Sequence, residues 1–196
     1  MSVTPRALRR VSVAVLVVAT AALFAAPAGA LADPAEWGDT FCTETTAWLA
    51  GAQAGAEDLS TQAEDPSLTP GDAKALIVDF LGTGVDATTA FAKEMKLAGA
   101  PDVQNGAKIQ VAILTGIGGS AAKLAALEKA AKAIPTKPLR AFRKASTKVS
   151  NGVASFSEPF TKGVSKAESL DSSGELGDVL GTLPSCAELD HLAGGG

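Results

Sequence analysis

Hydrophobic residues recur at helical spacing over most of the chain, beginning with the segment from Pro34 to Leu59. Its apolar side chains fall four or seven residues apart, which places all five on one face of a helix: Trp37, Phe41, Trp48, Ala52 and Leu59. Pro34 suits a first helical turn, and nearby acids complement the positive end of the helix dipole. The polar stretch that follows predicts a loop.

The same repeat predicts two further helices, from Thr69 to Ala98 and from Asp102 to Ala133. Thr69-Pro70-Gly71-Asp72 has the form of a capping box, and Asp102 is the expected cap of the next helix. Gly99 and Pro101 separate the two helices. The third helix is expected to bury Val103, Ala107, Val111, Leu114, Ile117, Ala121, Leu124 and Leu127.

A fourth repeat, with steps of three or four residues, runs from Leu139 to Leu170. Because it continues past Pro159, it predicts one long helix kinked near that proline, with a break at Asn151-Gly152 as the alternative. A short amphipathic piece from Leu176 to Leu183 follows. Ser185-Cys186-Ala187-Glu188 then has the capping-box form and predicts a last helical turn.

Four long helices with short connections, and no strand-like alternation, predict an all-α fold. The expected architecture is an antiparallel four-helix bundle with a short C-terminal helical extension.

The first 32 residues have the pattern of a cleaved signal peptide. Arg6, Arg9 and Arg10 precede an uncharged run over residues 11–26, which is shorter than the ~20 residues of a spanning helix. Ala30-Leu31-Ala32 predicts cleavage before Asp33, and Ala28-Gly29-Ala30 is a second cleavage motif. Residues 33–196 then form a single domain that is secreted, extracellular or attached to the cell wall. A retained membrane anchor is the alternative.

Cys42 and Cys186 are the only two cysteines, and two cysteines in an exported protein most often pair. We therefore expect a disulfide that clasps the C-terminal extension to the first helix. Closing so long a loop stabilises a domain by roughly 4–5 kcal/mol in the chain-entropy model. Free thiols are the alternative.

Charge is strongly segregated along the chain. Without the three leader arginines, 14 basic and 21 acidic residues give a net charge of −7, which argues against a nucleic-acid partner. Residues 33–72 hold nine acids and no base, whereas residues 123–148 hold eight bases and one acid. The candidate contact residues in this basic segment are Lys137, Arg140, Arg143 and Lys144. They suit an anionic wall polymer, lipid headgroups or a protein partner, and an ordinary solvated surface is the alternative.

Residues for catalysis or metal binding are scarce. His191 is the only histidine, and one histidine supplies neither a metal site nor a serine hydrolase by itself. The glycine-rich run from Gly116 to Ser120 lacks the Gly-Lys-Ser/Thr ending of a phosphate loop, which favours close helix packing or a kink. We therefore expect no catalytic residue, no metal and no cofactor.

Trp37, Phe41, Cys42 and Trp48 near the start, and a late Pro184-Ser185-Cys186, resemble the layout of small secreted all-helical proteins of high-GC Gram-positive bacteria. Such proteins mostly lack an assigned activity, so the resemblance implies no functional residue. The expected function is a non-enzymatic binding or structural role at the bacterial cell envelope. One alternative is a peripheral membrane-surface binder, suggested by the cationic stretch from Gly116 to Ile134. Another is a carrier that holds a small apolar ligand in a cavity lined by Phe80, Phe91, Phe142 and Phe156.

Overall fold

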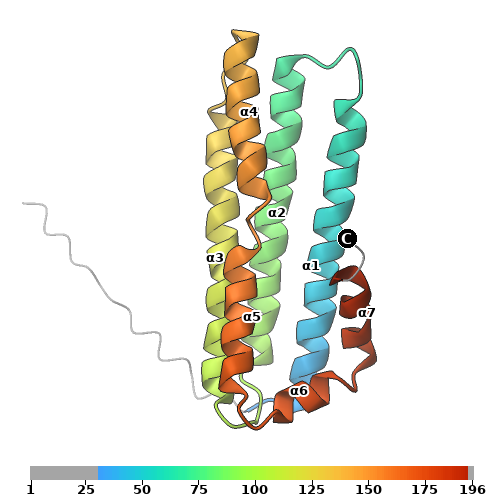
Figure 1. Ribbon diagram of the computed structural model, residues 1–196, viewed down its shortest axis with the longest axis vertical. Helices are drawn as coiled ribbons and strands as arrows, with labels where there is room; N and C mark the ends of the chain where they lie inside the picture. Colours follow the sequence, from blue (N-terminus) through green and yellow to red (C-terminus); the bar gives the residue numbers. More distant parts are fainter. Residues whose placement is uncertain (1–30, 194–196) are drawn as a thin grey trace, which may run out of the picture.

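The computed structural model describes residues 31–193, with side chains as far as Leu189, and shows a rod of long antiparallel helices (Figure 1). The predicted leader therefore lies almost wholly outside the described residues, as does the side chain of His191. The helices are α1 (Pro34–Ala63), α2 (Pro70–Ala98), α3 (Gly106–Lys132), α4 (Leu139–Val153), α5 (Glu158–Leu170), α6 (Glu175–Leu180) and α7 (Pro184–Ala193). With α4 and α5 stacked end to end, these helices confirm the predicted four-helix bundle.

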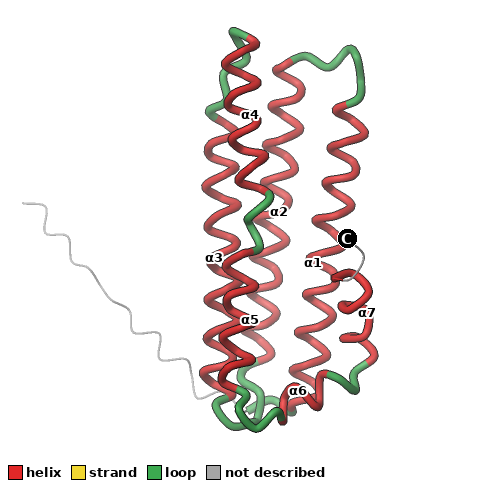
Figure 2. The backbone as a smooth tube through the Cα atoms, in the orientation of Figure 1, coloured by secondary structure: helices red, strands yellow, loops and turns green. Residues whose placement is uncertain are grey.

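Connections lie at the two ends of the rod, apart from the α4–α5 turn halfway along it (Figure 2). α6 lies across one end, and α7 returns along the outside of α1. The predicted capping box is confirmed, because Asp72 N–H donates to Thr69 Oγ1 and Thr69 N–H donates to the Asp72 carboxylate. Asp33 caps α1 by accepting from Ala35 N–H at 2.9 Å.

α3 begins four residues later than predicted, so Asp102 is not its cap. Asp102 N–H instead donates to the Ala32 carbonyl at 2.8 Å, and Ala32 N–H donates to the Ala100 carbonyl at 2.8 Å. Asn105, with a φ of 63°, precedes the first helical residue. The chain just before α1 is therefore paired with the α2–α3 connection.

We call α4 and α5, which lie end to end, the fourth column of the bundle. It consists of two helices, so the predicted single helix kinked near Pro159 is wrong. The alternative break at Asn151-Gly152 is also wrong, because both residues are helical and the turn spans residues 154–157. Pro159 has no N–H to donate to the Ser155 carbonyl, and its ring would clash with that carbonyl in a continuous helix. Lys123 of α3 donates to the Ser155 carbonyl at 2.6 Å and to Glu158 at 3.2 Å.

The aromatic stripe of α1 lies in the core, as predicted. The Trp48 ring meets those of Phe156 and Phe160 edge-on, with centroids 5.5 and 5.2 Å apart. Its indole N–H donates to Thr88 Oγ1 at 2.9 Å, whereas that of Trp37 donates to Gln110 Oε1 at 2.8 Å. Both buried indoles therefore have a hydrogen-bond partner, as burial of a polar group requires.

The predicted buried face of α3 is right for Ile117 and Leu124 and wrong for Ala107, which is exposed, and for Val111, which is 63% exposed. α3 packs against both α2 and α5. The buried residues in its first half are therefore Gly106, Ile109, Gln110, Ala112, Ile113 and Gly116. Gly116 lies against the backbone of α5, where a Cβ would come 3.0 Å from the Pro159 carbonyl oxygen. The expected close helix packing at this glycine is therefore confirmed.

The Cys42–Cys186 disulfide is confirmed, with the two Cα atoms 4.9 Å apart. It fastens α7 to the outside of α1. Gly38 on α1 makes room for the end of α6 and the α6–α7 connection, because a Cβ there would lie 2.7 Å from Leu180 and Leu183 side-chain atoms. The predicted capping box at Ser185 is wrong, since α7 already begins at Pro184 and Ser185 Oγ has no hydrogen-bond partner.

Candidate binding surfaces

The predicted basic residues gather at the end of the rod where α3 passes into α4. Lys137 lies in the connection and Arg140, Arg143 and Lys144 on the first turns of α4, and all four are exposed. Among the described residues none of the four forms an ion pair, whereas the neighbouring Lys132 pairs with Glu128 at 2.6 Å. Leu139, half exposed, adds an apolar contact to the cluster.

An acidic corner lies at the same end of the rod, where α1 passes into α2. Its carboxylates are exposed on the last turns of α1, in the connection and on the first turn of α2: Glu57, Asp58, Glu64, Asp65 and Asp72. Hydrogen bonds from Ser67 lower the pKa of Asp65, and hydrogen bonds from Thr69 lower the pKa of Asp72. These interactions shape local turns, so neither carboxylate is tuned for proton transfer at neutral pH.

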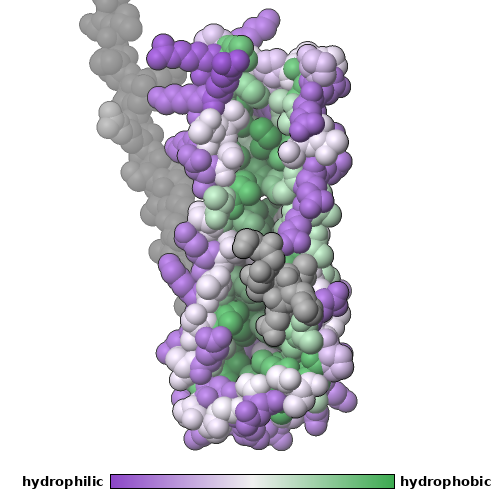
Figure 3. Space-filling view, turned by 45° about the vertical axis from the view of Figure 1, so that its right-hand side comes forward, coloured by the Kyte–Doolittle hydropathy of each residue, from purple (hydrophilic) through white to green (hydrophobic). Residues whose placement is uncertain are grey.

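An apolar hollow of about 240 Å³ opens between α1, α2 and α4, in the half of the rod that carries the basic cluster and the acidic corner. Figure 3 shows hydrophobic surface along the molecule between two hydrophilic margins. We call the hollow between α1, α2 and α4 the upper hollow. Its apolar lining includes Trp48, Leu59, Leu76, Phe80, Val153 and Phe156. Most of these side chains are only partly buried, so their apolar atoms face one another without filling the space.

The upper hollow exists because α1 changes from aromatic to small residues after Trp48. Gly51, Ala52 and Gly55 line it, and a Cβ added to Gly51 would have no neighbour within 4 Å. Of the four phenylalanines predicted to line a ligand cavity, Phe80 and Phe156 do so. The other two pack elsewhere. Phe91 packs against Trp48 and Phe160, whereas Phe142 packs against the cluster around Leu81.

A second hollow, of about 440 Å³, flanks the disulfide between α1, α5, α6 and α7. Trp37 and Phe41 border it on one side, and Leu176 and Leu180 of the clasped segment border it on the other. This space was not predicted, because nothing in the hydrophobic pattern of residues 175–180 shows where α6 lies relative to α5.

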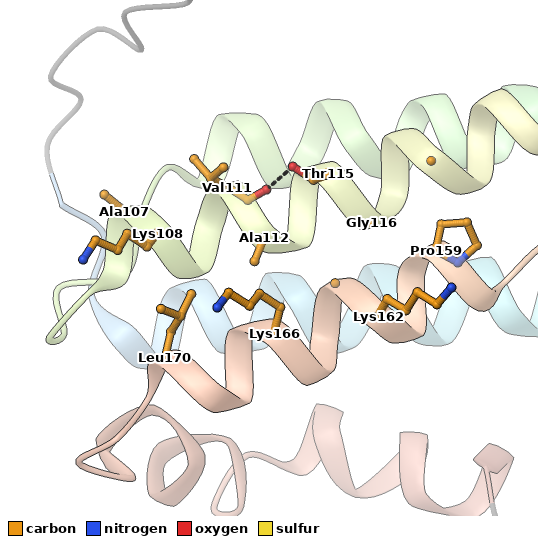
Figure 4. A pocket seen from close by; sticks show the side chains of 12 residues that line it. Ala107, Lys108, Val111, Ala112, Thr115, Gly116, Pro159, Lys162, Lys166 and Leu170 are labelled. Carbon is orange, nitrogen blue, oxygen red and sulfur yellow. Dashed lines mark hydrogen bonds between the residues drawn. The ribbon is translucent and has the colours of Figure 1, made fainter.

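An open groove of about 910 Å³ runs between α3 and α5 on the outer surface of the bundle (Figure 4). We call it the lysine groove. Small residues and Val111 form its floor, and the lysines that line it are Lys108 of α3 and Lys162 and Lys166 of α5. The groove was not predicted from the sequence, although Lys162 and Lys166 stand four residues apart and hence on one face of α5.

Metal binding, thiol chemistry and membrane insertion each place requirements on the described residues, 31–193. In that range, no group of three or more histidine, cysteine, aspartate or glutamate residues is arranged to hold a metal ion. Both cysteines are consumed by the disulfide. Two helices, α2 and α3, are long and apolar enough to cross a membrane by length and composition, but core helices of soluble proteins meet the same criterion.

No protein-family model, no curated protein and no solved structure matches this chain. Any assignment of function therefore rests on the surfaces described above.

Proposed function

We propose that this protein is exported and acts without catalysis as a binding protein of the bacterial cell envelope, holding a small apolar ligand in the upper hollow. Export is supported by the leader pattern of residues 1–32 together with the disulfide, since disulfides persist in oxidising compartments outside the cytoplasm. The observation that carries ligand binding is the set of partly exposed apolar side chains that line a hollow of about 240 Å³.

Physical chemistry favours an apolar occupant. Most of the lining is aliphatic or aromatic. The polar groups in it are Asp58 and Gln62 from the last two turns of α1 and Asp79 and Thr83 from the first half of α2. Asp58 already accepts a hydrogen bond from Gln62 Nε2 at 2.8 Å. A ligand that covers Phe80 and Phe156 gains the hydrophobic free energy of removing that surface from water, roughly 25 cal/mol per Å².

Titration with N-phenyl-1-naphthylamine, an uncharged probe that fluoresces in apolar surroundings, tests this proposal. The wild type should bind the probe, and Gly51→Leu, which places a side chain in open space of the hollow, should weaken binding by roughly tenfold. Gly118→Leu is the matched control: Gly118 is also exposed within a helix and also has open space around its Cβ position, but lies outside the hollow. Equal probe affinity in the two variants would contradict the proposal.

The exposed basic cluster supports a second candidate function, docking on an anionic surface of the envelope. Its four cations have no ion pair among the described residues, so they are available to a partner's phosphates or carboxylates. Binding to phosphatidylglycerol vesicles or purified anionic wall polymer should weaken as salt rises. Replacing Lys137, Arg140, Arg143 and Lys144 by glutamine should abolish it. A variant with the same change at Lys74, Lys93, Lys96 and Lys129 controls for net charge, and equal loss in both would reject a specific cluster.

A further inference from the structure

The lysine groove combines an apolar floor with an unbalanced positive rim. Ala107, Val111 and Ala112 of α3 and Leu170 of α5 supply apolar contacts, and Val111 is 63% exposed. Val111 lies in the second turn of α3, and Ala107, one turn before it, is also exposed, so both side chains add apolar surface to the groove. The groove therefore offers hydrophobic free energy to any chain that covers it.

The charges around this floor are all of one sign. Its lining contains no carboxylate, and Lys162 and Lys166 form no ion pair within the described part of the chain. Lys108 makes one hydrogen bond, to Asn105 Oδ1 at 3.3 Å. This local excess of cations stands out in a chain whose formal net charge is −4, and it favours an anionic occupant.

The side chains also give the groove a direction. In Figure 4 Lys108 and Lys166 both extend toward the end that contains Leu170, whereas Lys162 extends toward Pro159. Two ammonium groups at one end and one at the other place the stronger anion site near Leu170. The methylene stem of Lys162 is left to cover an apolar chain, as long cationic side chains do.

The length of the groove matches a single acyl chain. From Ala107 to Gly119, α3 rises about 18 Å, at 1.5 Å per residue. One leaflet of a bilayer's hydrocarbon core, which is the depth of one extended acyl chain, is about 15 Å. Gly116, Gly119 and Gly163 have no side chains to rise above the contact between the two helices, so such a chain can lie over that contact along the groove.

We propose that the lysine groove is a binding site for one long-chain fatty acid, whose chain lies along α3 and whose carboxylate sits between Lys108 and Lys166. The site shares no lining residue with the upper hollow, so it does not depend on the function proposed for that space. A flat apolar surface would suit a membrane better, but this surface is hollowed and has the length of one chain.

Calorimetric titration of the full protein with sodium tetradecanoate, below its micelle concentration, tests the site. We expect one bound molecule per chain, and affinity that rises by up to about fourfold per added methylene until the chain fills the groove. Tetradecanol, which lacks the charge, should bind roughly fivefold more weakly. Replacing Lys108 and Lys166 together by glutamine should weaken tetradecanoate binding by a similar factor, because each exposed ion pair contributes little. Lys93→Gln with Lys129→Gln is the charge-matched control.

Val111→Glu supplies the decisive variant, since it places a carboxylate on the groove floor at an exposed position where folding is not at risk. It should lower tetradecanoate affinity at least tenfold, whereas Leu97→Glu, at a 70% exposed leucine outside the groove, should leave it unchanged. If Gly51→Leu lowers the affinity for tetradecanoate and Val111→Glu does not, the fatty acid binds in the upper hollow and the proposal is overturned. Binding only to phosphatidylglycerol vesicles, with no monomeric tetradecanoate bound, would identify a membrane surface and overturn it too.

Discussion

Gly116 of α3 and Gly163 of α5 meet backbone to backbone. A Cβ built on Gly163 would lie 2.9 Å from the Gly116 Cα and 2.8 Å from the Ala112 carbonyl oxygen, both closer than side chains tolerate. This contact joins the fourth column to α3 and sets the depth of the lysine groove between them.

Gly163→Ala should therefore destabilise the protein. The added methyl group meets backbone atoms, so α3 and α5 must separate, at a cost of about 1–3 kcal/mol that exceeds the ~1 kcal/mol gained in helix propensity. Gly118→Ala adds the same methyl group in open space and should stabilise the protein by up to about 1 kcal/mol. Urea unfolding followed by tryptophan fluorescence measures both changes, and stabilisation by both substitutions would refute the tight contact.

The disulfide should stabilise the domain and hold α6 and α7 on α1. Replacing Cys42 and Cys186 together by alanine should lower the free energy of unfolding by as much as about 4–5 kcal/mol, the value for a loop of this length. Limited proteolysis should then cut the segment from Asp171 to Leu183 faster than in the wild type. Iodoacetamide without reductant should leave the mass of the wild type unchanged, and a mass increase would show free thiols.

Much of the fold follows from the sequence because its signals are local or covalent. The aromatic stripe of α1 has one buried face, so its period identifies the core side directly. Thr69 and Asp72 lie three residues apart and satisfy each other, which fixes the start of α2. Cys42 and Cys186 have no other cysteine with which to pair.

The predictions that failed concern residues whose position depends on contacts with other helices. α3 packs against α2 on one side and α5 on another, so its period alone did not show that Val111 would remain exposed. The turn over residues 154–157 needs Lys123 from a different helix to bind the Ser155 carbonyl. The lysine groove depends on the contact between Gly116 and Gly163, and glycines add nothing to a hydrophobic pattern.

Asp72 should have a pKa below its usual 3.8 in the folded protein. The Thr69 hydroxyl donates to its carboxylate at 2.6 Å and is the larger cause, and the Thr69 backbone N–H is the second. A lowered folded pKa means that this contribution to stability is present above pH 3.8 and is lost as the pH falls through the folded value. A carboxyl NMR titration should show that Thr69→Val raises the Asp72 pKa toward 3.8; an unchanged value would exclude the hydroxyl as the cause.

The pairing of Ala32 distinguishes between the two cleavage motifs of the leader. Cleavage before Asp33 would remove the residue whose N–H and carbonyl bond to Ala100 and Asp102, at 2.8 Å each. Cleavage after Ala30 keeps both bonds, and Leu31 then becomes an exposed first residue. For the export proposed above, we therefore expect the processed protein to have an intact mass that corresponds to a start at Leu31, and a mass corresponding to Asp33 would contradict this. A recombinant form beginning at Asp33 should be less stable by about 1–3 kcal/mol, at 0.5–1.5 kcal/mol for each lost hydrogen bond.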